Sequence, residues 1–358
     1  MTLRTTITRT AIALGSGAAL FIGAAWLMSS ETRPIPDTDV GFTTLSFEVD
    51  HRNKALDLHI WYPTDAQGPA ALIAQNALFY GFHAHADAAP REGKHPLVVF
   101  SHGSGGRMTQ MGWLASALAE QGFIVAGVNH HGTTSMDSDP HRTIEIWDRP
   151  MDLSAVLDAF EAGAISGIQA DMGNVTGAGF SLGGHTALAL SGARVSKAAY
   201  IDYCDAHVGM LDCGWMTAGG VDFNDIDAAR YEASFADPRI TASFAIDPAL
   251  PAAMTRDSLA AIATPTLLIN LSNPGAIPAG VDASQLVGPM QNAEQITVAG
   301  SWHMSAIAEC SMLGRVIIGV SGMFTGETNI CGQAERRRTA VHAEMLEHIL
   351  PFMARNAM

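Results

Sequence analysis

The sequence predicts an α/β protein with a mostly parallel central sheet and helices on both faces. Strand-like and helical segments alternate from residue 95 to the C-terminus, the pattern typical of such a sheet. The run "HPLVVF" at 95–100 is continuously apolar, as expected for a strand that is buried on both faces. The chain has 358 residues, of which 48% are hydrophobic and 15% charged, so it can bury a large core.

The N-terminal segment differs from the rest of the chain. Arg4 and Arg9 precede residues 10–30, a run without any charge. Basic residues followed by an apolar run of about 20 residues indicate a secretory signal or a single membrane anchor. We expect residues 1–30 to be one of these two, 31–43 to be a linker, and 44–358 to be the folded domain. The protein is then periplasmic, anchored outside the cytoplasm, or secreted.

The first half of the domain begins with a predicted hairpin. Residues 45–50 and 55–64 contain β-branched and aromatic residues around a polar turn. The buried strand at 95–100 is followed by a helical pattern at 109–122 and a strand at 123–130. A helix at 149–163 begins with a proline in its first turn.

The second half continues the alternation after one interruption. A strand at 174–181 leads directly into a helix at 182–192. From about Val195 to Pro238 the pattern breaks, and we expect an insertion before the next core strand at 240–247. The remaining predicted elements are a helix at 258–263, strands at 264–271 and 294–300, and a C-terminal helix at 340–354.

The stretch "GFSLG" places Ser181 between Gly179 and Gly183, where a strand meets a helix. G-x-S-x-G in this context is a nucleophile elbow, a strained turn that exposes the serine and requires small flanking residues. We therefore predict that Ser181 is a catalytic nucleophile. The backbone N–H of Leu182, at the start of the helix, is positioned to stabilise an oxyanion.

A second oxyanion donor is expected from "FSHGSGG", which follows the strand at 95–100. Hydrolases of this architecture take their second amide from the loop after this strand. We predict that the Ser104 N–H supplies it. His102 is expected to brace the loop by hydrogen bonding and not to take part in the chemistry.

The general base of such a fold is a histidine late in the chain, after the nucleophile and the acid. Beyond His207 the sequence contains only His303, His342 and His348. The last two lie on the predicted C-terminal helix, whereas His303 follows a strand in the stretch "AGSWHMSA". We predict that His303 takes the proton of the nucleophile.

Three aspartates are candidates for the acid that orients this histidine. Asp247 ends the strand at 240–247 and is the preferred candidate. Asp282 is the first carboxylate after the strand at 264–271, which is another common place for the acid. Asp202 lies near the insertion. The sequence favours Asp247 and leaves the other two open.

Four cysteines, Cys204, Cys213, Cys310 and Cys331, are consistent with disulfides in an exported protein. Pairing in sequence order is one of three possible connectivities, and spacing alone does not decide among them.

No metal or other cofactor is expected. The cysteines lack C-x-x-C spacing, and serine chemistry needs no metal. The pairs His130–His131 and His83–His85 are interpreted as loop histidines near a cleft. The formal net charge of −15 argues against a nucleic-acid partner.

An ordered set of motifs resembles the bacterial dienelactone-hydrolase-like proteins and the related platelet-activating-factor acetylhydrolases. These motifs are "WYPT", "VVFSHGSGG", "RPMDLSAVLDAF", "GAGFSLGGHTALAL", "DPRITASFAIDPAL" and "AGSWHMSAIAEC". The resemblance implies an α/β-hydrolase fold with an insertion before the sixth strand. It also implies that the acid follows the sixth strand, where Asp247 stands, and that Cys310 pairs with Cys331.

The expected function is hydrolysis of a small carboxylic ester through an acyl-enzyme by a Ser-His-Asp triad. The alternatives are an acyltransferase with the same triad and a non-catalytic protein that only binds a ligand. Apolar residues of the insertion, Met210 and Trp215 above all, are candidates for the substrate pocket. The oligomeric state is left open.

Overall fold

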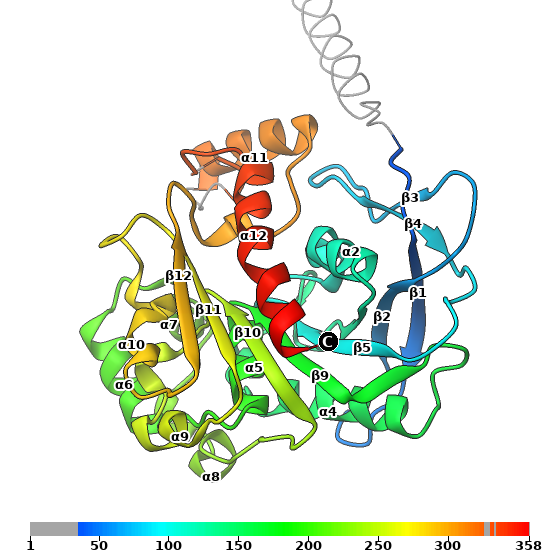
Figure 1. Ribbon diagram of the computed structural model, residues 1–358. Coiled ribbons are helices and arrows are strands. Elements are labelled where there is room, and N and C mark those ends of the chain that lie inside the picture. The colour runs from blue at the N-terminus through cyan, green and yellow to red at the C-terminus, as the bar shows by residue number, and fades with distance from the viewer. Residues whose placement is uncertain (1–34, 326–329, 333, 358) are drawn as a thin grey trace, which may run out of the picture.

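A ten-stranded sheet organises the structure, a computed structural model that describes residues 35–325, 330–332 and 334–357 (Figure 1). The predicted signal or anchor at 1–30 lies outside these residues. The strand order is β12-β11-β10-β9-β5-β6-β2-β1-β4-β3. The first six of these strands are parallel, as expected for the centre of the fold. The strands are β1 (Val40–Phe47), β2 (Leu56–Pro63), β3 (Ala71–Ile73), β4 (Phe82–Ala86), β5 (His95–Ser101), β6 (Ile124–Val128), β9 (Ala170–Phe180), β10 (Ile240–Ile246), β11 (Thr266–Leu271) and β12 (Ala293–Val298).

The N-terminal hairpin extends the sheet beyond its parallel part. β1 and β2 pair antiparallel from Val40↔Pro63 to Phe47↔Leu56. β1 therefore begins within the predicted linker at 31–43, because Val40 already pairs with the second strand. Two short strands, β3 and β4, form the outer edge and have no counterpart among the predicted elements.

Helices cover both faces of the sheet, and α12 crosses in front of it in Figure 1. The longer helices are α2 (Gly112–Glu120), α4 (Asp148–Glu161), α5 (Leu182–Leu190), α6 (Lys197–Ala206), α7 (Leu211–Ala218), α11 (Met312–Thr325) and α12 (Arg338–Asn356). The short ones are α3 (Pro140–Thr143), α8 (Ala228–Tyr231), α9 (Arg256–Ala261) and α10 (Ser284–Val287), with 3-10 turns η1 (Met108–Met111), η2 (Phe223–Asp225), η3 (Pro251–Ala253), η4 (Ala279–Val281) and η5 (His303–Ala306). A separate two-stranded hairpin joins β7 (Thr133–Thr134) to β8 (Asp137–Ser138).

Side chains of β5 alternate between two cores. Val98 and Phe100 pack with α2 and α12 on one face of the sheet. Leu97 and Val99 pack with α4 on the other face. This alternation, with period two, explains why the strand reads as a continuous apolar run: both faces are buried.

The insertion between α5 and β10 consists of α6, α7, η2 and α8. It packs onto the sheet through a third core, which includes Tyr200 and Met216 from the insertion and Ala245 and Leu268 from the sheet. The insertion is thus a part of the domain with its own buried side chains.

Both disulfides pair the cysteines in sequence order, Cys204 with Cys213 and Cys310 with Cys331. Two disulfides indicate an oxidising, extracytoplasmic compartment. Within 35–325 and the described residues that follow, no helix is long and apolar enough to cross a membrane.

Candidate active site

Ser181 lies on a sharp turn between β9 and α5. Its φ of 57° and ψ of −121° are in a region that residues other than glycine rarely adopt. The turn is held by backbone hydrogen bonds from Ser181 N–H to Ile246 O (2.9 Å) and from Ala249 N–H to Ser181 O (2.9 Å). An added Cβ at Gly183 would collide with the backbone of Ser101. The glycine is required because the helix begins directly against the end of β5.

A chain of hydrogen bonds links Ser181, His303 and Asp247. His303 Nε2 lies 3.0 Å from Ser181 Oγ, and His303 Nδ1 lies 2.9 Å from Asp247 Oδ2. With Nδ1 protonated toward the carboxylate, Nε2 is free to accept the serine proton. The ring of His303 also packs on Phe180, with 4.7 Å between the ring centroids. Three residues from distant parts of the chain thus meet at the carboxyl ends of the parallel strands.

Asp247 is fully buried directly after β10, with an unusual φ of 43°. Its Oδ1 accepts hydrogen bonds from Leu271 N–H (2.8 Å) and Asn270 Nδ2 (3.1 Å). These donors occupy one carboxylate oxygen and leave Oδ2 directed at His303. The carboxylate therefore has a fixed orientation.

The alternative acids and bases lie elsewhere. Asp282 lies between η4 and α10, where its Oδ1 accepts a local hydrogen bond from Ser284 N–H at 3.0 Å. Asp202 is exposed on α6. His342 stacks on Trp113 with 3.7 Å between centroids and bonds the Ser305 carbonyl at 2.8 Å, while His348 is exposed on α12.

The loop after β5 passes directly beside the serine. A Cβ at Gly103 would lie 3.2 Å from the Ser181 Cβ, so the loop backbone is in contact with the elbow. The loop turns through a hydrogen bond from Gly106 N–H to Gly103 O (3.0 Å) and exposes Ser104. The two predicted oxyanion residues, Ser104 and Leu182, therefore belong to the two backbone segments that flank Ser181.

The expectation of loop histidines near a cleft is confirmed for one pair and wrong for the other. His130 and His131 lie in the loop after β6, and His131 lines a cavity of about 190 Å³. By contrast, His83 and His85 lie on strand β4, between β1 and β3, where His85 bonds the Thr38 carbonyl. His130 is fully buried and its Nδ1 lies 2.7 Å from Asp152.

Met210 and Trp215 occupy different environments in the insertion. Met210 packs against the third core, whereas Trp215 is 42% exposed on α7. A cavity of about 750 Å³ lies at the far end of α5 from Ser181, and neither residue lines it. Their part in substrate binding remains a prediction.

Arg149 and its partners were not anticipated by sequence reasoning. Arg149 is 1% exposed, near the start of α4, and donates to the carbonyl of His102 beside the Ser104 loop. The signal was the spacing of Arg149 and Asp152, two charged residues three positions apart on the apolar side of a predicted helix.

Comparisons with known proteins agree with this fold. Residues 82–141 match the family model of platelet-activating factor acetylhydrolase, isoform II, which confirms the resemblance over that segment. The segment contains β5, α2, β6 and the loop with Ser104. No curated protein sequence matches the chain significantly.

Two solved structures complete the comparison. A ferulic acid esterase from Streptomyces cinnamoneus is similar over 91% of this chain and 92% of its own, with a TM-score of 0.62 and 19% identity. A puromycin-hydrolysing peptidase of Mycobacterium tuberculosis is similar over 73% of this chain and 36% of its own, with a TM-score of 0.43 and 16% identity. At 19% identity the first likeness establishes the fold alone, and this chain has the α/β-hydrolase fold.

Proposed function

We propose that this α/β-hydrolase-fold protein is a serine esterase that cleaves small carboxylic esters through an acyl-enzyme. The observation that carries the proposal is the continuous hydrogen-bonded chain from Ser181 through His303 to the buried Asp247. A protein that only binds a ligand has no use for a serine held at a φ of 57°, since such strain costs about 1–3 kcal/mol.

Acylation begins when Ser181 Oγ attacks the ester carbonyl carbon and its proton passes to His303 Nε2. Asp247 stabilises the imidazolium that forms. The amides of Leu182 and Ser104 donate to the oxyanion of the tetrahedral intermediate. The C–O bond to the alcohol then breaks, and His303 returns the proton to the leaving oxygen.

Deacylation repeats the steps with water. His303 takes a proton from water, the hydroxide attacks the acyl carbon, and Ser181 leaves with the proton returned to its Oγ. No metal or other cofactor enters the proposed reaction.

The proposed place of action is outside the cytoplasm. The disulfides support an oxidising compartment, and the uncharged run at 10–30 supports export or anchoring.

A panel of p-nitrophenyl esters of increasing acyl length tests the proposal with the purified full chain. We expect hydrolysis by the wild type and a loss of kcat of at least about 10³-fold in Ser181→Ala, because the nucleophile is removed. The melting temperature should change little. A fluorophosphonate probe should label Ser181 alone. Wild-type activity that persists in Ser181→Ala would refute the proposal.

A further inference from the structure

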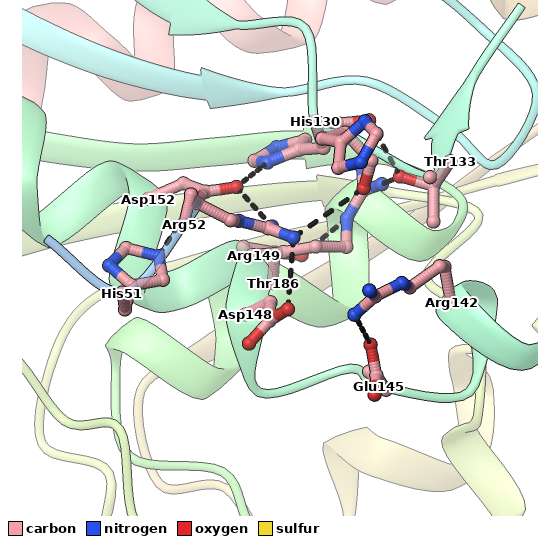
Figure 2. Close-up of polar contacts among 12 residues, drawn as sticks. His51, Arg52, His130, Thr133, Arg142, Glu145, Asp148, Arg149, Asp152 and Thr186 are labelled. Atoms are coloured by element: carbon pink, nitrogen blue, oxygen red, sulfur yellow. Dashed lines mark hydrogen bonds and ion pairs between the residues drawn. The ribbon is translucent and has the colours of Figure 1, made fainter. Parts of the chain in front are cut away.

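Figure 2 shows a cluster of polar side chains around Arg149. Arg149 is 1% exposed. A guanidinium in such a place is costly unless its donors are satisfied. Burial lowers the pKa of Arg149 to about 9, and the charge of Asp152 acts against this shift. Arg149 therefore remains charged at neutral pH.

The donors of Arg149 bond oxygens from three separate segments. Nη2 donates to the His102 carbonyl and to Ser101 Oγ (3.0 Å), at the end of β5. Nη1 donates to Thr133 Oγ1 (2.6 Å), in the hairpin β7–β8. Nε donates to Thr186 Oγ1 (3.3 Å), in α5.

Each of these segments either contains a residue of the proposed oxyanion hole or bonds the backbone next to one. The His102 carbonyl lies two residues before Ser104. The Thr133 carbonyl accepts from Gly105 N–H (2.9 Å), the residue after Ser104. Thr186 Oγ1 donates to the Leu182 carbonyl (2.9 Å). The guanidinium thus connects both sides of the site through one rigid, planar group.

A second layer fixes the orientation of Arg149's partners. Ser101 Oγ lies 2.9 Å from His130 Nε2, and His130 Nδ1 donates to Asp152 (2.7 Å). Asp152 also accepts from His51 and, at 2.6 Å, from Arg52. Burial alone would raise the pKa of Asp152, but the bonds from His130, His51 and Arg52 lower it, so it stays ionised. Burial lowers the pKa of His130 to about 3, which keeps that ring neutral.

We propose that Arg149 is a positioning residue that holds the Ser104 loop and the start of α5 at the separation that the oxyanion hole requires. This inference rests on the proposed esterase function. It assigns to Arg149 no contact with substrate: the residue acts through the backbone of His102 and through Thr186. A displacement of about 1 Å in such a site costs about 10²-fold in rate.

The test is steady-state kinetics of Arg149→Met and Arg149→Lys in the full chain on one p-nitrophenyl ester. We expect kcat to fall about 10²-fold in Arg149→Met, because the two amides lose their fixed separation. KM should change less than about threefold. Arg149→Lys should recover a part of kcat, since lysine keeps the charge but not the planar fork.

Arg239→Met is the matched control for the loss of an arginine that anchors α4. Arg239 bonds Asp158 and the Ser154 carbonyl of the same helix and Asp237 before β10, away from Ser181. Arg239→Met should lower the melting temperature and leave kcat within about twofold of the wild-type value. If Arg149→Met also leaves kcat within about threefold, the positioning role is wrong.

Isosteric variants cover the case in which Arg149→Met does not fold. Thr133→Val removes one acceptor of the guanidinium and should lower kcat about tenfold. Thr176→Val is its control, because the buried Thr176 Oγ1 has no hydrogen-bond partner among the described residues. Equal kcat in these two variants would refute the inference. The esterase function itself would be refuted if the wild type had no esterase activity, or if Ser181→Ala were as active as the wild type.

Discussion

The backbone and hydrogen bonds of Asp247 direct its carboxylate at His303. It is fully buried with a φ of 43°, and three hydrogen bonds hold its carboxylate. We expect Asp247→Asn to lower kcat about 10⁴-fold, because an amide cannot balance the imidazolium and favours the wrong histidine tautomer. The kcat of the purified variant on a p-nitrophenyl ester measures this.

Asp282→Asn is the control for that prediction. The Asp282 carboxylate accepts a local hydrogen bond from Ser284 N–H. Its replacement should leave kcat within about twofold and cost about 1 kcal/mol of stability or less, the contribution of one exposed hydrogen bond. If instead Asp282→Asn is the damaging change, the proposed acid is wrong.

The hydrogen-bonded chain at the site could be predicted from the sequence because each member follows a strand. Ser181 and Asp247 directly follow β9 and β10, and His303 lies in the loop after β12. The cluster around Arg149 could not be predicted in this way. Its partners come from β5, the hairpin β7–β8 and α5, and only the packed structure shows which oxygens the guanidinium reaches.

At the scale of elements, the central parallel strands and the helices α2, α4, α5 and α12 could be predicted, because their apolar residues repeat with the period of a strand or of a helix. β4 was missed because it is short and its sequence "FHAHA" alternates buried Phe82 and Ala84 with half-buried histidines, which do not form an apolar run. α11 was missed because its apolar residues, such as Val316 and Val320, are partly exposed and do not mark a buried face. Whether such segments form a strand or a helix depends on their contacts with the rest of the fold.

The helix α7 offers a test of the predicted role of the insertion. Gly219, at its C-terminal end, packs against Pro140 of α3, which follows the hairpin that holds Gly105. The end of α7 therefore lies next to the segment that supports the Ser104 loop. We expect Trp215→Ala to change the ratio of kcat/KM between short and long acyl chains about tenfold. A p-nitrophenyl ester series measures the ratio.

Leu72→Ala, on the outer edge strand β3, is the control for an exposed apolar side chain of the same domain. The ratio should not change in this variant. If Trp215→Ala behaves like Leu72→Ala, the insertion does not contribute to substrate selection.

The disulfide Cys310–Cys331 joins the segment after His303 to the segment that precedes α12. It closes a loop with a sequence separation of 21. We expect the double variant Cys310→Ser/Cys331→Ser to lose about 3 kcal/mol of unfolding free energy, because the unfolded chain gains freedom. Urea denaturation measures this. Both thiols found free in exported wild type would contradict the prediction.

At the scale of the whole molecule, the six parallel strands bring the ends of β5, β9, β10 and β12 to one edge of the sheet. This arrangement lets residues 122 positions apart, such as Ser181 and His303, form a hydrogen bond. Ligands of α/β sheets bind at this edge because loops and helix N-termini meet there. The site is thus a property of the sheet topology and not of any one segment.

The same packing buries several histidines and makes the fold sensitive to acid. Burial lowers the pKa of His59 and His185 to about 4 and of His130 and His342 to about 3. In the unfolded chain these rings take up protons below about pH 6.5. Between about pH 6.5 and 4 the unfolded state therefore binds more protons, so stability falls as the pH falls.

Each such histidine contributes a slope of up to about 1.4 kcal/mol per pH unit in that window. We expect urea denaturation to give a clearly lower unfolding free energy at pH 5 than at pH 7.5. In His185→Leu the change of unfolding free energy with pH should be smaller by the equivalent of about one proton. The buried His185 Nδ1 has no hydrogen-bond partner within the described chain, so leucine can replace the ring without breaking a hydrogen bond. Equal stability of the wild type at the two pH values would show that these rings are protonated in the folded state.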